Sequence, residues 1–138
     1  MKLLTFQARR FRWRTFERTL EEVEHLDVDE EVAEAVVAFL HAEEADRDPD
    51  ARPGVVRKTL KHLKWVANKR ELRTVVLHSF THLGGERTDP LFAQELLEEL
   101  AQRLRDTGYD VRSTPFGHMC EWELSVYGES MAKVWKEV

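Results

Sequence analysis

The sequence is short of the residues that build stapled or membrane-bound proteins. It contains a single cysteine, Cys120, so no disulfide can form within the chain and no cysteine-based zinc or iron–sulfur site can be assembled. No stretch approaches the ~18 consecutive apolar residues of a membrane span, and the apolar start is too short for a signal peptide. We therefore expect a cytoplasmic protein without membrane contact.

What is present suffices for one core. Of the 138 residues, 42% are hydrophobic and 34% are charged. This composition is too apolar for a disordered chain. Folding at this length should bury roughly two-thirds of the surface that the unfolded chain exposes. With no internal repeat and no linker, we expect a single domain over residues 1–138.

The net charge of −5 hides a strong segregation of charge along the chain. Residues 1–20 hold six basic side chains against one acidic, residues 21–50 hold thirteen acidic against one basic, and residues 51–73 hold eight basic against one acidic. The acidic balance argues against indiscriminate binding of nucleic acid, yet the two basic segments permit a local patch that attracts phosphate. Mutual pairing of basic and acidic segments is the alternative.

Periodicity in the first half of the chain predicts strands. Lys2–Phe6 and Phe11–Phe16 are expected as two strands joined by a tight turn around Ala8–Arg10. The apolar run Ala35–Leu40 is rich in β-branched and aromatic residues, which favours a buried strand. The acidic stretch before it is expected to be a surface connection.

The second half alternates helices and strands. Apolar residues recur at helical spacing from Val55 to about Arg70. Asp89 and Pro90 predict the N-cap and first residue of a second helix, and Gly108 predicts its end. Strands are expected over residues 74–80, 109–113 and 119–126, and a short helix over 128–138. This order predicts an α/β domain with helices packed on one mixed β-sheet.

The stretch His78–Pro90 is the strongest candidate for a functional site. It leaves the carboxyl end of a predicted central strand and enters a helix, which is where α/β sheets place ligands. Gly84 and Gly85 allow close approach of the backbone, and their amides can receive a phosphate or carboxylate beside a helix N-terminus. A plain strand-to-helix loop is the alternative.

Two further interpretations are open at this point. His78, His82 and Glu86 offer metal ligands, although they lack the helical spacing that makes a zinc motif specific. Cys120 and His118 share a face if a strand begins at His118, which is the arrangement of a nucleophile and its base. A lone cysteine in an apolar strand is more often an inert buried thiol.

Three blocks of the sequence occur together at a specific spacing. The first is Phe80–Glu86 with Pro90 opening a helix, and the second is a leucine-rich helix that runs into Gly108–Val111. The third is Pro115–Gly117, followed by a strand and Gly128. Together they resemble the archaeal-type N-terminal editing domain of threonyl-tRNA synthetase, whose fold is similar to that of D-aminoacyl-tRNA deacylase. The resemblance extends over nearly the whole chain and implies that fold.

The resemblance also implies an activity. Editing domains of this family hydrolyse the ester that joins misattached serine to the terminal adenosine of threonine tRNA. Binding alone discriminates one methylene by only about 1–3 kcal/mol, so a second, hydrolytic site is needed. In the family, the water is activated with help from the ribose hydroxyl of the substrate, main-chain groups hold the amino acid, and a histidine and a lysine assist. No cofactor or metal is expected.

The catalytic positions transfer only in part. His82 falls on the family's histidine, whereas Cys120 falls on the position of its lysine. Loss of a positioned cation costs on the order of 2–4 kcal/mol of transition-state stabilisation, and Arg9 is a candidate replacement. Thr81 stands where alanine is common, which predicts a narrower pocket. The substrate-binding candidates are Gln7, Arg9, Phe80, Thr81, Gly84, Gly85, Glu86, Phe116, Gly117, His118 and Met119, and the candidates for contact with tRNA phosphates are Arg10, Arg12 and Arg14.

Three hypotheses about function follow. The leading one is a free-standing hydrolase that deacylates mischarged tRNA in trans, since nothing resembling a synthetase's ATP or zinc site accompanies the domain; threonyl-tRNA synthetase is a possible partner. The second is a module of the same fold that binds aminoacyl-tRNA or a nucleoside without turnover, because a lysine is missing at Cys120. The third is an interaction protein that forms a homodimer through its apolar aromatics.

Overall fold

The computed structural model describes residues 1–138 as six strands, two α-helices and two short 3-10 turns. The strands and helices alternate as the sequence predicts in the middle of the chain but not at its ends. In chain order the elements are β1 (Lys2–Arg18), β2 (Asp29–His41), η1 (Glu44–Arg47), α1 (Arg52–Asn68), β3 (Thr74–Ser79), α2 (Pro90–Asp106), β4 (Asp110–Ser113), β5 (His118–Val126), η2 (Ser130–Ala132) and β6 (Lys133–Glu137).

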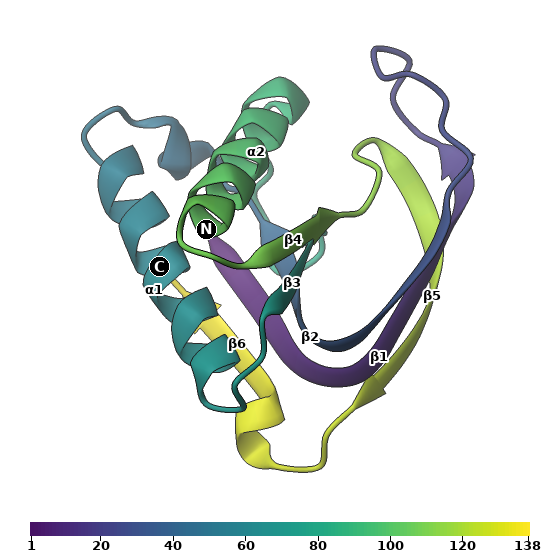
Figure 1. The fold of residues 1–138 in the computed structure, drawn as a ribbon. Helices are drawn as coiled ribbons and strands as arrows, with labels where there is room; N and C mark the ends of the chain where they lie inside the picture. The colour runs from purple at the N-terminus through teal and green to yellow at the C-terminus, as the bar shows by residue number, and fades with distance from the viewer.

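One mixed sheet organises the molecule. Its strand order is β4-β3-β2-β1-β5, and β6 pairs with the part of β1 that β5 leaves free. The segments β2-α1-β3 and β3-α2-β4 join parallel strands through helices, as predicted, whereas β1 is antiparallel to β2, β5 and β6. The long strands β1, β2 and β5 curl, and both helices lie on one side of the sheet (Figure 1). The other side holds a cleft, and we call it the hollow side.

The predicted turn around Ala8–Arg10 is wrong, because β1 runs unbroken from Lys2 to Arg18. The alternation of its side chains changes phase at Arg9: Gln7 is buried toward α1, while Ala8 and Phe11 both belong to the cluster on the opposite face. The register with β5 shifts at the same place. A β-bulge therefore produced the sequence pattern that resembles a turn.

The predicted C-terminal helix is also wrong. Residues 133–137 form strand β6, which pairs with Lys2–Phe6 of β1. Because β5 covers only Ala8 to Arg18, the first half of β1 has unpaired backbone groups on that side. Strand β6 supplies their hydrogen bonds, and tertiary context outweighs the local helical pattern.

The ends of α2 are formed as the sequence indicates. Asp89 is its N-cap and accepts a hydrogen bond from the amide of Phe92 at 3.1 Å, and Pro90 is its first residue. Gly108, just beyond the helix, has φ +94°, a conformation that glycine adopts without strain. Neither helix has the length and apolar character needed to cross a membrane.

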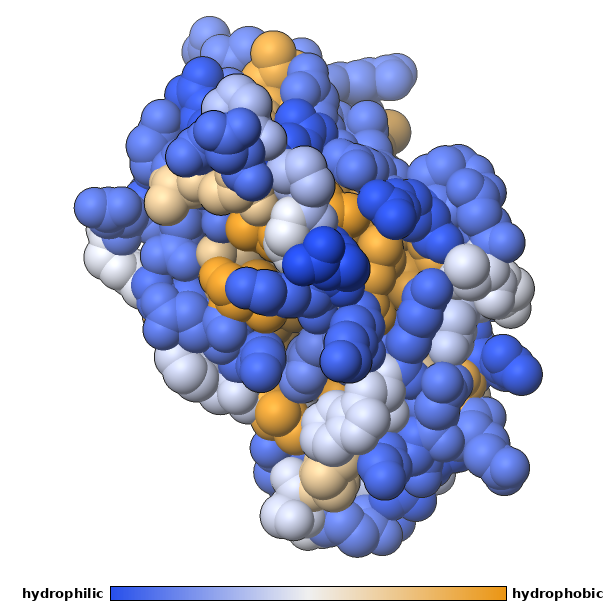
Figure 2. All heavy atoms as spheres, turned by 90° about the vertical axis from the view of Figure 1, so that its left-hand side faces the viewer, coloured by the Kyte–Doolittle hydropathy of each residue, from blue (hydrophilic) through white to orange (hydrophobic).

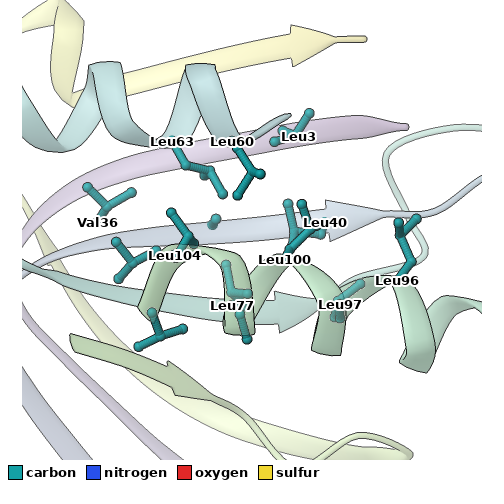
Figure 3. Close-up of a cluster of buried hydrophobic side chains, with 14 of the residues drawn as sticks. Leu3, Val36, Leu40, Leu60, Leu63, Leu77, Leu96, Leu97, Leu100 and Leu104 are labelled. Atoms are coloured by element: carbon teal, nitrogen blue, oxygen red, sulfur yellow. The ribbon is translucent and has the colours of Figure 1, made fainter. Parts of the chain in front are cut away.

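Each face of the sheet buries its own hydrophobic cluster. The covered cluster, between the sheet and both helices, contains 23 buried residues and is mainly aliphatic; Leu63, Leu77 and Leu100 are at its centre (Figure 3). The hollow cluster, on the opposite face, has seven buried residues that include Phe11, Trp13 and Phe39. Trp13 is fully buried and stacks on Phe11 at 5.4 Å, so its ring is closed to external partners.

Candidate functional site

A cleft of about 450 Å³ opens at the hollow side of the sheet. Strand β3 and the loop after it form one wall, and β5 with the Pro115–Gly117 turn forms the other. The start of α2 and the segment after β1 close its ends, through Pro90 and Leu20. Its volume is in the range of small-ligand sites, which are about 300–1,000 Å³.

His78 is at the floor of the cleft. It is 6% exposed, and its Nδ1 is 2.7 Å from the hydroxyl oxygen of Thr114. Burial lowers the pKa of His78 to about 4, so its imidazole is neutral at pH 7. Its Nε2 has no protein partner and is not sealed from solvent, because the ring lines the cleft. A buried ring nitrogen is therefore available to a ligand.

His41 fixes the loop that forms the first wall. The amide of Leu83 donates to Nδ1 of His41 at 3.1 Å, which assigns the proton to Nε2, and Nε2 donates to the carbonyl oxygen of Glu86. His41 is fully buried, although acidic residues follow it closely in the sequence. One imidazole thus clamps both halves of the loop from Phe80 to Asp89.

The clamped loop brings His82 and Arg87 to the cleft. His82 is exposed, and its ring meets the face of Phe80 edge-on at 5.2 Å. Arg87 forms no salt bridge, and it is the only arginine or lysine among the residues that line the cleft. This charge is where a negatively charged group of a ligand is favoured.

Gly117 shapes the opposite wall. Its φ is +74°, a backbone conformation that disfavours a side chain, and a Cβ there would lie 2.7 Å from Cγ2 of Val23. Both the backbone and the lack of space therefore require glycine. Its carbonyl oxygen accepts hydrogen bonds from the amide and the hydroxyl of Thr19, at 2.7 and 3.0 Å. The turn therefore packs directly on the segment that follows β1.

His118 is committed to structure. Its Nε2 accepts from the amide of Leu26 at 3.1 Å, so its Nδ1 carries the proton and donates to the carbonyl oxygen of Phe116 at 3.1 Å. Neither nitrogen is free to take a proton from Cys120. Burial raises the pKa of the Cys120 thiol, which keeps it protonated at neutral pH. The geometry therefore disfavours a nucleophilic cysteine.

Most of the candidate residues of the sequence meet at this cleft. Of the two catalytic and eleven substrate-binding candidates, eight line the cleft. They come from the Phe80–Asp89 loop and from the β4–β5 turn with the start of β5. They are His82, Cys120, Phe80, Thr81, Phe116, Gly117, His118 and Met119.

Five candidates lie outside the cleft. Gln7 is buried, where its Nε2 donates to the carbonyl oxygen of Val66 at 2.8 Å. Arg9 is at the bend of β1, its guanidinium 4.3 Å from the ring centroid of Tyr127, so it contributes no cation to the cleft. Three residues of the loop, Gly84, Gly85 and Glu86, also do not line the cleft. A Cβ on Gly84 would lie 2.8 Å from Nζ of Lys2, so this glycine serves a close contact rather than a phosphate cradle.

The three arginines expected to meet tRNA form an ion-pair ladder instead. Arg10 pairs with Glu31 at 2.6 Å, and Arg12 pairs with Asp29 at 2.8 Å across the β1–β2 ladder. On the other side, Arg14 pairs with Glu121 and both other arginines reach Glu123. Each arginine on this face of the sheet already has a carboxylate partner.

Sequence reasoning missed three functional candidates. Arg87 belongs to the stretch His78–Pro90, but its position at the cleft depends on the His41 clamp. Thr114 and Trp122 carried no signal of their own, because their place depends on β4 and β5 meeting beside β3. The metal interpretation of His78, His82 and Glu86 is not supported, since no three histidine, cysteine, aspartate or glutamate side chains are grouped to hold an ion.

The curled mixed sheet, two helices on one face and a cleft on the other define a D-aminoacyl-tRNA deacylase-like fold. The solved structure of c-Myc DNA Unwinding Element Binding Protein has this architecture, with a TM-score of 0.63 at 15% identity, covering 100% of this chain and 99% of that one. Residues 1–138 match the archaea-specific editing domain of threonyl-tRNA synthetase, and the chain belongs to that family.

Curated relatives are threonine–tRNA ligases of archaea. The enzyme of Staphylothermus marinus is 28% identical over 142 residues, which cover 100% of this chain and 22% of the relative. Those of Thermococcus kodakarensis and Methanosphaera stadtmanae are 31% and 30% identical, over 73% and 78% of this chain and 16% and 18% of their own length. The chain thus spans about a fifth of the length of these relatives, and its role is editing-domain-like.

Proposed function

We propose that the cleft binds the aminoacylated 3′-terminal adenosine of a tRNA and that the protein hydrolyses the ester of a misattached amino acid. Seryl-tRNA for threonine is the favoured substrate. The observation that supports this most is His82, the family's histidine, exposed beside an open cleft whose other wall is the Pro115–Gly117 turn.

The cleft offers a group for each part of such a substrate. Phe80 and Trp122 give apolar surface for the adenine, and Trp122 is 41% exposed. Thr81 narrows the space for the amino-acid side chain, which favours serine over the larger threonine. Arg87 faces negative charge, either the phosphate of the terminal nucleotide or the oxyanion that forms during the reaction.

Hydrolysis adds water across the ester, so the carbonyl carbon gains the hydroxyl and the ribose oxygen leaves with a proton. The neutral Nε2 of His78 and the imidazole of His82 are ring nitrogens along the cleft that can hold substrate or water by hydrogen bonds. Because His78 has a pKa of about 4, it serves as a hydrogen-bonding group and not as a strong base at neutral pH.

The test is release of serine from seryl-tRNA for threonine, timed in a single turnover with the protein in excess. We expect release faster than spontaneous hydrolysis, with His82→Ala slower than the unchanged chain. Arg87→Gln should also slow the release of serine. Its matched control is Arg9→Gln, which makes the same change outside the cleft. Release no faster than the spontaneous rate at saturating protein would contradict the proposal.

A second candidate function is binding of the aminoacylated end without turnover. It is favoured by Cys120, which stands in place of a lysine and whose pKa is raised by burial, so that it is uncharged at neutral pH. It predicts tight binding of a non-hydrolysable seryl-adenosine analogue with no serine release, and some activity after Cys120→Lys. The homodimer stays a prediction, for which light scattering is the measurement.

A further inference from the structure

The exposed face of α1 gathers the basic residues of segment 51–73 on one side. We call it the basic face and define it by Arg57, Lys58, Lys61 and Lys64, with the exposed Trp65 among them. At 3.6 residues per turn these five fall within about 120° of the helix circumference. The opposite side of α1 is buried against the sheet.

The charges of the basic face are unpartnered. In the same segment Arg52 pairs with Glu99 at 3.0 Å and Arg70 pairs with Glu129, but none of the four cations of the basic face has a carboxylate within salt-bridge distance. In the arginine ladder of β1, by contrast, Arg10, Arg12 and Arg14 are each paired with a carboxylate. One face of α1 therefore carries four positive charges that no carboxylate of the chain neutralises.

Strand β6 extends the basic face. The hydroxyl of Thr5 bridges His62 of α1 at 3.2 Å and the carbonyl oxygen of Val134 in β6 at 3.1 Å, so the two elements lie side by side (Figure 1). Lys136 of β6 is close enough that its charge, after burial, contributes to lowering the pKa of His62. Seen from this side, the surface is largely hydrophilic, with apolar residues showing between the polar ones (Figure 2).

We propose that the basic face is the docking surface for the phosphate backbone of the tRNA whose aminoacylated end enters the cleft. The proposal rests on the proposed function for its choice of RNA. Residues one helical turn apart have Cβ atoms about 5–6 Å from one another, so several long cationic side chains on one face can reach neighbouring phosphates of a strand. Trp65, 43% exposed, adds a ring on which a sugar or base can stack.

An anionic membrane is the other polyanionic partner, and α1 suits it poorly. Helices that lie on membranes insert an apolar face among the lipids. The apolar face of α1, with Leu60, Leu63 and Val66, is already buried in the covered cluster. What α1 leaves to solvent is charge and one tryptophan, which matches a phosphate backbone.

Two triple variants with the same change of net charge test the location. Arg57→Gln, Lys58→Gln and Lys61→Gln remove three charges from the basic face, and Arg10→Gln, Arg12→Gln and Arg14→Gln remove three from the ladder. The probe is unacylated tRNA, with affinity measured by fluorescence anisotropy from 50 to 300 mM salt (on the order of physiological ionic strength). Circular dichroism checks that both variants are folded.

We expect the basic-face variant to lose about 10-fold or more in affinity at ~0.1 M salt, and the slope of log affinity against log salt to fall by about 2–3. The ladder variant should keep the slope of the unchanged chain. Equal losses in the two variants, or an unchanged slope in the first, overturn the proposal. Binding of the unchanged chain to phosphatidylserine vesicles but not to tRNA overturns it too.

The two proposals fail separately. If tRNA binds through the basic face but serine is not released, the docking surface stands and the hydrolytic function fails. The opposite result is also possible: the unchanged chain and both variants hydrolyse a short substrate, 3′-seryl-adenosine, equally fast, and the basic-face variant binds tRNA as tightly as the unchanged chain. In that case the hydrolytic function stands and the docking surface is wrong.

Discussion

The two faces of the sheet are built differently. The covered cluster joins the sheet to both helices through aliphatic side chains, and its central leucines are sealed from solvent. The hollow cluster is smaller and richer in aromatic residues. Phe80 packs against it, Trp122 contacts its Phe39 at 5.0 Å between ring centroids, and both line the cleft. One face thus supplies most of the stability, whereas the other uses part of its apolar surface to hold a ligand.

The largest expected effect comes from a cavity in the covered cluster. Leu100 is fully buried there, so Leu100→Ala should lower the free energy of unfolding by about 2–5 kcal/mol. Leu124→Ala makes the same change on the half-buried edge of the hollow cluster and should cost less than half as much. Urea unfolding measures both free energies. Equal losses would contradict the view that the covered cluster supplies most of the stability.

The next largest effect concerns charge in the cleft. Arg87→Gln should slow single-turnover deacylation by about 10²–10³-fold if the guanidinium faces developing negative charge. Arg9→Gln should change the rate by less than ~3-fold, the scatter expected of a group outside the reacting centre, since Arg9 stacks on Tyr127 outside the cleft. The reverse order of the two would return the cation's role to Arg9.

The hollow face should also set the pH dependence of stability. The pKa of His78 falls from its ordinary value of 6.5 to about 4 in the folded chain. As pH falls from 6.5 towards 4, the unfolded chain takes up this proton and the folded chain does not, so the free energy of unfolding should fall by about 3 kcal/mol. His78→Gln should remove this part. His62, whose pKa is also lowered, is retained and cancels in the difference.

The smallest effect is expected on the ladder. Arg12→Gln breaks contacts with Asp29 and Glu123, but all three side chains are substantially exposed. Exposed ion pairs contribute little, because solvent and salt screen them. The urea midpoint should stay within experimental error of the unchanged chain, and a clear shift would make the ladder a structural element rather than a surface feature.

The sequence predicted elements well where local rules decide them. The Asp89–Pro90 start of α2, its end at Gly108 and the buried strand Ala35–Leu40 are confirmed, because capping chemistry and apolar runs are local. The bulge at Arg9 and strand β6 were missed, since both depend on which half of β1 meets which partner. Local pattern contains no such information.

The candidate site divides in the same way. His82 and the Pro115–Gly117 turn each came from a short contiguous motif, and the structure places both at the cleft. Arg87 was missed, and Arg9 was chosen in its place, because the direction of each side chain depends on distant partners, His41 for the loop and Tyr127 for the bend. The ladder partners of Arg10, Arg12 and Arg14 lie on other strands and were equally invisible.

The change of phase at Arg9 has an evolutionary consequence. Before it, β1 contributes alternate side chains to the helix-covered layer, and after it the same strand contributes them to the floor of the hollow. The latter half of β1 packs in the hollow cluster through Phe11 and Trp13, so substitutions there leave the leucines of the covered cluster untouched. Evolution can therefore change the residues that line the cleft, and with them the ligand, while the covered cluster keeps the domain folded.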